Sequence, residues 1–326
     1  MIPSPAPAGR SPVLPHLHLH LEPEERKRRE LGMPGRNFGD RHLFFEAHRV
    51  DRTDAVPVTG QDLRRFLTDV HTEQRQQGVD HVELRLSPRR FLRDGMSWQE
   101  FTDTAQDCLA PLRDPVVRAV LLVNRDSPAP FLATVTERIA ELPPVFTGID
   151  LAGDEIPHPD VRPAVPLFRA AADSGLGRTV HAGEFGPAEH IWQALDELGA
   201  QRIGHGVSAA TSSALLRRMA RDGILLEVSL TSNAALGAVP GPGAHPLPAF
   251  LEAGVPVAFN SDVPLHTGRT LDDELRFAAA ALGAAPEVIR DLQSRAARHR
   301  FTRRPPVRPP ARSGSASSPP AGSGCG

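Results

Sequence analysis

Eight short apolar runs alternate with longer amphipathic stretches along most of this chain, and this alternation limits its possible folds more than any other feature. A helix fits between successive runs, so the strands are expected to lie parallel. Eight parallel strands favour a closed (β/α)8 TIM barrel, whose core takes about 250 residues. The strands are expected at residues 17–21, 81–86, 117–124, 147–153, 178–184, 201–206, 224–230 and 256–262.

The stretches between the runs have the period of helices. Within residues 63–70, apolar residues recur at i, i+3, i+4 and i+7, and Thr59 can cap the N-terminus of this helix. A second helix is expected over residues 188–198. An open, doubly wound sheet is the alternative architecture, but the sequence has no GxGxxG or GxxxxGK[ST] loop to support it.

The overall charge and composition exclude several classes of protein. The 326 residues include 37 Lys and Arg against 39 Asp and Glu, a net charge of −2, which disfavours a broadly basic nucleic-acid-binding surface. No apolar run has the roughly 18 residues that a membrane helix needs, and Cys108 and Cys325 cannot form a disulfide framework. We therefore expect a soluble, cytoplasmic protein without a nucleic-acid or membrane partner. The sequence leaves the oligomeric state open.

Composition also divides the chain into three parts. Residues 1–13 are a Pro-rich lead, and residues 303–326 are a low-complexity tail rich in Pro, Gly, Ser and Arg. Both are expected to be disordered, because they have too few apolar residues to form a core. Residues 14–302 carry the regular pattern and are expected to form the barrel. A partner-binding arm is the alternative role for the basic tail.

Histidines and carboxylates stand at the ends of four of the expected strands. In a barrel the carboxyl ends of the strands converge on one mouth, where active sites lie. Imidazoles combined with a carboxylate are a typical zinc ligand set that leaves a position for water. The residues are His16, His18 and His20 on the first strand, His181 and Glu184 on the fifth, His205 on the sixth and Asp262 on the eighth.

Each of these residues also has a purely structural interpretation. A buried histidine often satisfies polar groups of the core, and an Asp after an apolar run is often a helix cap. Their recurrence on four strands favours the metal site. Other polar residues of the strands are interpreted structurally: Glu83 and Arg85 as an internal ion pair, and Glu227 in the same way. Three histidines in loop-like sequence are expected at the surface: His158, His245 and His266.

The motifs at the strand ends resemble, in the same order, those of the adenosine deaminase family of the metal-dependent amidohydrolase superfamily. This resemblance implies a TIM barrel of the metallo-dependent hydrolase type with one Zn²⁺ per chain. It also implies hydrolysis of a C–N bond of a cyclic amidine, namely deamination of adenosine or a related aminopurine nucleoside with release of ammonia. The motifs are HLHLE (18–22), GIDLAGDE (148–155), TVHAGE (179–184), RIGHG (202–206), EVSLTSN (227–233) and HPLPAFLEAGVPVAFNSD (245–262).

The resemblance assigns roles to individual residues. Glu184 matches the acid that protonates a purine ring nitrogen, and His205 matches the residue that orients and helps deprotonate the attacking water. A carboxylic acid must be protonated to donate, and burial at the barrel mouth would raise its pKa in the required direction. The residues that match the zinc ligands are His18, His20, His181 and Asp262.

The positions that match substrate contacts include departures from the family pattern. The N–H of Gly153 matches a contact to a ring nitrogen, and Glu22 matches an acid that faces the ribose hydroxyls. Val263 stands where the family usually has a second acid that binds a ring nitrogen, and Pro23 replaces a glycine. Residues 22–80 are fewer than the family usually places before its second strand, which indicates a shorter cover over the substrate. We expect these changes to shift the substrate away from adenosine.

Two alternatives to aminopurine deamination remain open. The first is a different amidohydrolase reaction on the same metal site. The second is a catalytically weak relative that only binds a ligand. The presence of Glu184 and His205 beside a full set of ligands disfavours the second alternative, because a binding protein needs neither an acid nor a base.

Overall fold

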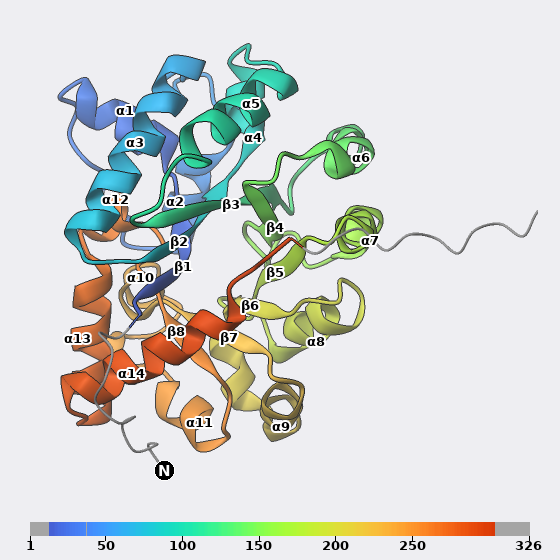
Figure 1. The fold of residues 1–326 in the computed structure, drawn as a ribbon. Helices are drawn as coiled ribbons and strands as arrows, with labels where there is room; N and C mark the ends of the chain where they lie inside the picture. Colours follow the sequence, from blue (N-terminus) through green and yellow to red (C-terminus); the bar gives the residue numbers. More distant parts are fainter. Residues whose placement is uncertain (1–12, 37, 304–326) are drawn as a thin grey trace, which may run out of the picture.

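The computed structural model describes residues 13–36 and 38–303, and it is built around one eight-stranded parallel sheet (Figure 1). The strands are hydrogen-bonded in sequence order, so each strand lies beside the next along the chain. The expectations for residues 1–12 and 304–326 lie outside the described residues. The strands are β1 (Pro15–His20), β2 (His81–Leu86), β3 (Val116–Asn124), β4 (Phe146–Ala152), β5 (Gly177–Ala182), β6 (Arg202–His205), β7 (Leu225–Val228) and β8 (Val257–Phe259).

The sheet closes almost completely into a barrel, because the segment after β8 returns to β1. A parallel bridge joins Leu19 and Asp262. The N–H of His20 donates to the carbonyl of Asp262 at 2.8 Å, and the N–H of Asp262 donates to the carbonyl of His18 at 3.2 Å. The predicted TIM barrel is therefore confirmed, and the open doubly wound sheet is excluded.

Side chains complete the seam between β8 and β1, because β8 has only three residues. The side-chain oxygen of Asn260 accepts from the N–H of Leu17 at 2.9 Å. The carboxamide of Gln293 accepts from the N–H of Phe259 at 2.7 Å and donates to the carbonyls of Phe259 and Pro15. The side-chain carboxamides of Asn260 and Gln293 thus supply the hydrogen bonds that the backbone of a longer β8 would have made.

Helices cover the outside of the barrel, as Figure 1 shows. The helix predicted over residues 63–70 is confirmed within α3, where Thr59 and Asp62 form a capping box. The α-helices are α1 (Pro23–Glu30), α2 (Arg41–His48), α3 (Gly60–Gln76), α4 (Pro88–Arg93), α5 (Trp98–Leu109), α6 (Ala129–Arg138), α7 (Val165–Asp173), α8 (Ala188–Asp196), α9 (Ser213–Asp222), α10 (Leu230–Ala235), α11 (Leu247–Glu252), α12 (Pro264–Thr267), α13 (Leu271–Leu282) and α14 (Pro286–Ala296). Among the described residues, no helix combines the length and the apolar character that a membrane crossing requires.

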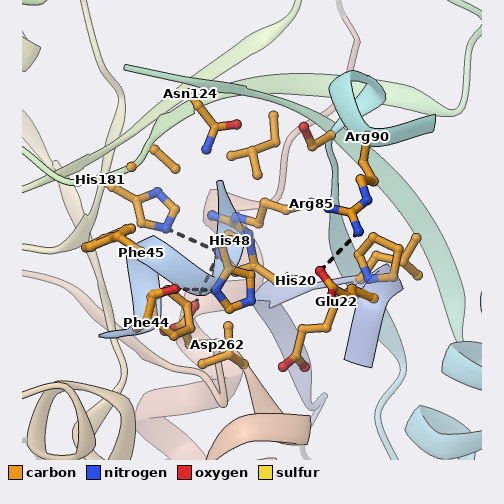
Figure 2. Close-up of a pocket in the computed structure, with 18 of the residues that line it drawn as sticks. His20, Glu22, Phe44, Phe45, His48, Arg85, Arg90, Asn124, His181 and Asp262 are labelled. Carbon is orange, nitrogen blue, oxygen red and sulfur yellow. Dashed lines mark hydrogen bonds and ion pairs between the residues drawn. The ribbon is translucent and has the colours of Figure 1, made fainter. Parts of the chain in front are cut away.

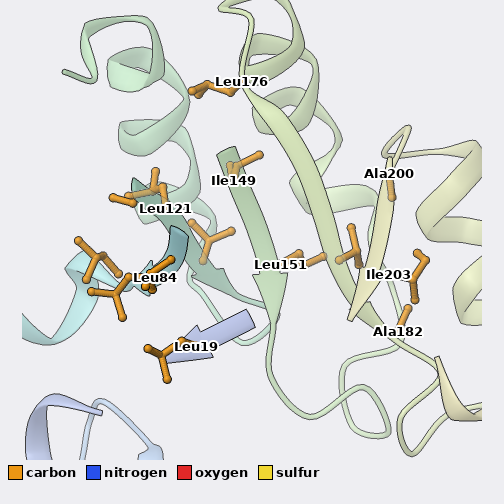
Figure 3. Close-up of a cluster of buried hydrophobic side chains, with 14 of the residues drawn as sticks. Leu19, Leu84, Leu121, Ile149, Leu151, Leu176, Ala182, Ala200 and Ile203 are labelled. Carbon is orange, nitrogen blue, oxygen red and sulfur yellow. The ribbon is translucent and has the colours of Figure 1, made fainter. Parts of the chain in front are cut away.

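The apolar core lies between the strands and the surrounding helices. Figure 3 shows part of it, with Leu84, Leu121, Ile149 and Ile203 among the buried side chains. Successive residues of a strand point to opposite faces of the sheet. The residues that alternate with these apolar ones therefore point into the barrel.

The interior of the barrel holds a buried ionic network. Glu83 and Arg85 do not form the ion pair that the sequence suggested, because each side chain pairs across the barrel instead. Glu83 pairs with Arg202, while Arg85 pairs with Asp150 on β4 and with Glu227 on β7. Side chains at i and i+2 of a strand stand parallel and about 6.6 Å apart, so residues of other strands come closer and supply the opposite charge.

The seam predicts a large effect of Gln293→Leu on stability. Leucine would leave the N–H of Phe259 and two carbonyls without their buried partners, at about 1–3 kcal/mol for each unsatisfied group. For the three groups together we expect the free energy of unfolding in urea to fall by about 3–9 kcal/mol. Gln99→Leu on the exposed side of α5 is the matched control and should change it by less than about 0.5 kcal/mol. Equal effects of the two changes would contradict the role of Gln293.

Candidate functional site

Four side chains at the carboxyl ends of the strands form a cluster that can hold a metal ion. Each offers one ligand atom, and these atoms all lie within 4.8 Å of one another. Nε2 of His20 lies 3.2 Å from Nε2 of His18 and 3.2 Å from Nε2 of His181. Oδ1 of Asp262 lies 3.2 Å from Nε2 of His20 (Figure 2). The sequence-predicted ligands His18, His20, His181 and Asp262 are therefore brought together by β1, β5 and the end of β8.

The hydrogen bonds of two of these histidines direct their ring protons away from the cluster. Nδ1 of His18 lies 2.8 Å from the carboxylate of Glu227, and Nδ1 of His181 lies 3.1 Å from that of Asp150. A proton on Nδ1 leaves the lone pair of Nε2 facing the other ligand atoms. Imidazole nitrogens with one carboxylate oxygen suit a borderline divalent cation such as zinc. The residues present therefore fit such an ion.

His16 has a different role from the other two histidines of β1. Its Nδ1 contacts the side-chain oxygen of Gln74 at 2.7 Å, and its Nε2 accepts from the N–H of Ser261 at 3.0 Å. Complete burial lowers the pKa of His16 to about 4, so this residue is neutral at pH 7. His16 thus connects α3, β1 and the segment after β8.

Glu184 and His205 lie together beside the ligand cluster. Nδ2 of Asn233 donates to Oε1 of Glu184 at 3.0 Å and to Nδ1 of His205 at 2.9 Å. Burial raises the pKa of Glu184 well above its ordinary range, which favours the neutral acid. Burial also lowers the pKa of His205 to about 3, which favours the neutral imidazole. The site therefore pairs a protonated carboxyl group with an uncharged histidine.

The hydrogen bonds around the site involve residues that sequence reasoning missed. Ser232 donates to Oδ2 of the ligand Asp262 at 2.6 Å, and Asn233 follows it on the short helix α10. Both residues are part of the EVSLTSN motif, and Asp150 is part of GIDLAGDE. Membership in these motifs is the signal in the sequence that could have identified the three residues as part of the site. Glu227 was assigned only a structural role, yet it contacts both Arg85 and His18.

Backbone conformation provides a further mark of the site. Within residues 13–36 and 38–303, the non-glycine residues with positive φ are Glu22 (52°), His205 (64°) and Asp262 (57°). All three were selected from the sequence as site candidates. A left-handed backbone at a residue with a Cβ is uncommon and costs energy, and it persists where the surrounding structure fixes it.

A cavity of about 170 Å³ opens beside the ligand cluster. Glu22, Gly153 and Val263, which the sequence marked as substrate contacts, all line it. One carboxylate oxygen of Glu22 accepts from the N–H of Leu265 at 3.0 Å, and burial raises the pKa of Glu22 to about 8. Asn124, at the end of β3, adds a carboxamide to the wall (Figure 2).

The short segment between β1 and β2 still provides a cover for this cavity. The helix α2 contributes Phe44, Phe45 and His48 to the lining (Figure 2). Arg41, at the start of α2, pairs with Asp154 at 2.8 Å, which holds the helix to the loop after β4. The cover thus includes a helix of eight residues, and the shorter cover that the sequence indicated stays a prediction.

Two of the three histidines that we expected at the surface are buried. His245 has an exposed fraction of 4% and packs against Phe250. The side chain of His266 is also 4% exposed, and its Nε2 lies 3.0 Å from that of His48 on the cover helix. His158 is exposed as expected. Proline and threonine neighbours indicated loops correctly, but loops near a barrel mouth can be packed beneath other segments.

Comparisons with known proteins agree with the motifs. The profile of the family described as Adenosine deaminase matches residues 36–307. An adenosine deaminase of Edwardsiella ictaluri is 34% identical over 253 residues, which cover 75% of this chain and 74% of that protein. An adenine deaminase of Streptomyces coelicolor is 30% identical over 294 residues, which cover 85% and 86%. The crystal structure of an adenine deaminase from Arthrobacter aurescens superposes with a TM-score of 0.78 at 26% identity, covering 90% of this chain and 94% of that one.

The ligand cluster predicts that Asp262→Ala abolishes stoichiometric zinc binding, because three imidazoles would remain without the anionic ligand. Zinc content after dialysis, measured by mass spectrometry of the purified protein, checks this. Asp160→Ala, at an exposed acid far along the sequence from the ligands, is the control and should keep the zinc content of the unmodified chain. One zinc per chain in the Asp262 variant would contradict the ligand role.

Proposed function

This chain belongs to the adenosine deaminase family, and from that premise we propose that it removes the exocyclic amine of a 6-aminopurine by hydrolysis. The observation that carries the proposal is the buried Glu184 carboxyl, whose pKa is raised by burial and which lines the cavity beside the ligand cluster. An ionised carboxylate would suit metal binding or a cationic substrate, whereas a neutral carboxyl can donate a proton to a ring nitrogen.

The metal and the protein would share the chemistry as follows. His18, His20, His181 and Asp262 would hold one zinc ion, which lowers the pKa of a bound water toward about 7. Glu184 donates its proton to a ring nitrogen, which makes the carbon that carries the amine more electrophilic. Water adds to that carbon, the C–N bond breaks, and the amine leaves as ammonia while a carbonyl remains. The overall reaction consumes one water for each ammonia released.

The hydrogen bonds around His205 support a role in orienting the attacking water. Its Nδ1 accepts from Asn233, so the neutral ring carries its proton on Nε2. A donor at Nε2 can hold the oxygen of the attacking water in position. After it has protonated the ring, the Glu184 carboxylate can receive a proton from that water, with Asn233 donating to the same carboxylate. In this arrangement His205 orients the water, and Glu184 carries the proton.

The lining of the cavity supports an aminopurine other than adenosine as the best substrate. Val263 lines the cavity with an apolar side chain that cannot bind a ring nitrogen. The cover helix adds Phe44 and Phe45, which suit the faces of a planar base. Oε1 of Glu22 makes no hydrogen bond among the described residues, and its ion-pair contact with Nε2 of His266 is long, at 3.5 Å, so this oxygen can bind a polar group of the substrate.

Ammonia release across a panel of 6-aminopurines tests the proposal. The zinc-loaded protein is assayed for ammonia with adenosine, 2′-deoxyadenosine, adenine and AMP, and for methylamine with N6-methyl-AMP. We expect at least one of the other members to be turned over with a higher kcat/KM than adenosine. Absence of amine release from every member, with one zinc bound per chain, would contradict the proposed reaction.

Val263→Asp tests the reason given for the preference. An acid at this position can bind a ring nitrogen, and a buried hydrogen bond that is made rather than left unmade changes binding by about 1–3 kcal/mol. We therefore expect kcat/KM for adenosine to rise by about tenfold. Val263→Leu keeps the position apolar and should leave this value unchanged. An unchanged kcat/KM for adenosine in the Asp variant would show that Val263 does not disfavour adenosine.

A further inference from the structure

Glu155 is a buried carboxylate that binds the backbone of the loop after β5. It lies two residues beyond Gly153, after the end of β4, and has an exposed fraction of 2%. Four N–H donors lie around its two oxygens. The donors are the backbone N–H groups of Gly183 at 2.9 Å, Phe185 at 2.7 Å and Gly186 at 2.8 Å, and Nδ1 of His190 at 2.9 Å.

The loop is wrapped closely around this carboxylate. A Cβ added to Gly186 would lie 2.9 Å from the carboxyl carbon of Glu155, so only glycine allows the main chain to approach this closely. Gly183 has φ +69°, a left-handed conformation that glycine adopts without strain. Burial alone would raise the pKa of Glu155, but the bonds from His190 and the backbone amides hold it at about 2. The carboxylate is therefore ionised whenever the protein is folded near neutral pH.

Glu184 is the residue between these donors. The backbone on both sides of it is bound to Glu155, while its own side chain reaches Asn233 and lines the cavity. A charged acceptor on one side of the main chain thus determines where the side chain on the other side points. The carboxylate of Glu155 accepts from four N–H donors. The side-chain amide of a glutamine at position 155 would instead turn its own N–H toward at least one of these donors.

We propose that Glu155 is a positioning residue for the reaction, whose carboxylate shapes loop 183–186 so that the Glu184 carboxyl is aimed at the substrate. Glu155 does not line the cavity and acts only through the loop. The proposal rests on the proposed function of Glu184 as the proton donor. It goes beyond that function by giving a residue outside the cavity control over the acid.

The same loop also contacts the cover of the cavity. The ring of Phe185 lies 6.0 Å from that of Phe45, and the guanidinium of Arg41 lies 5.7 Å from the Phe185 ring. Asp154, next to Glu155, pairs with Arg41. Two consecutive carboxylates therefore fix the acid loop and the cover helix to the same end of β4.

A double-mutant cycle tests whether Glu155 acts through Glu184. Glu155→Gln in the otherwise unmodified chain should lower kcat by about tenfold to a hundredfold with little change in KM, because the acid is misplaced while the cavity is intact. In the Glu184→Gln background, whose residual rate is measured in single turnovers, the same change should lower the rate by less than about twofold. Glu155→Asp, which keeps the charge on a shorter side chain, should recover part of kcat. Equal factors in the two backgrounds would show a general structural role and overturn the proposal.

Amide hydrogen exchange provides a readout that needs no activity. The N–H groups of Gly183, Phe185 and Gly186 should exchange slowly in the unmodified protein and much faster in Glu155→Gln, while those of β6 stay unchanged. Unchanged exchange in the loop would overturn the proposal even if no substrate were found. The unmodified enzyme could instead turn over no member of the 6-aminopurine panel while the loop amides exchange as expected. That result would contradict the proposed function but would support the role of Glu155 in shaping the loop. If the Gln variant does not fold, the Asp variant is measured in both assays with the same criteria.

Discussion

The buried guanidinium of Arg85 is the interaction on which the geometry of the site depends. Arg85 lies inside the barrel between Asp150 and Glu227, and these two carboxylates contact Nδ1 of His181 and of His18. Burial would raise the pKa of Glu227, but Arg85 and Arg202 hold it at about 2. The carboxylate therefore stays ionised and keeps the imidazole oriented. Removal of the guanidinium would leave Asp150 without its buried cationic partner and Glu227 with Arg202 alone, which is strongly destabilising.

The barrel turns this interior network into a site at its mouth. Parallel strands present their carboxyl ends on one side, so residues that are distant in sequence, such as His20 and Asp262, come within 3.2 Å. The left-handed backbone of Glu22, His205 and Asp262 falls at these strand ends. The hydrogen bonds of the surrounding strands and of the seam hold these conformations, and this is how an unfavourable local geometry can persist where it directs a side chain.

Much of this arrangement could be predicted from the sequence because it depends on periodicity. Short apolar runs between helical stretches located the eight strands, and the polar residues at the ends of these runs indicated the ligand cluster. The partners across the barrel could not be predicted, because strand order does not give the stagger between opposite strands. Glu83 and Arg85 were paired with each other for this reason, although their partners come from β4, β6 and β7.

Long-range packing of loops explains the other differences. The burial of the side chains of His245 and His266 depends on segments that are far away in sequence. The length of residues 22–80 indicated a shorter cover, but not that α2 supplies it. Glu155 was visible in the GIDLAGDE motif, but its four donors come from the loop after β5 and from α8. When a carboxylate binds several backbone amides of a distant loop, the residues next to it in sequence do not indicate this.

The central claim is that the buried Glu184 carboxyl is the proton donor beside a metal held by other residues. The most direct measurement is kcat together with zinc content for Glu184→Gln, with the exposed Glu189→Gln on α8 as control. The account predicts one zinc per chain in both variants, with kcat lowered by about 10²–10⁴-fold only in Glu184→Gln. A Glu184→Gln enzyme that keeps both its zinc and its turnover would contradict the account.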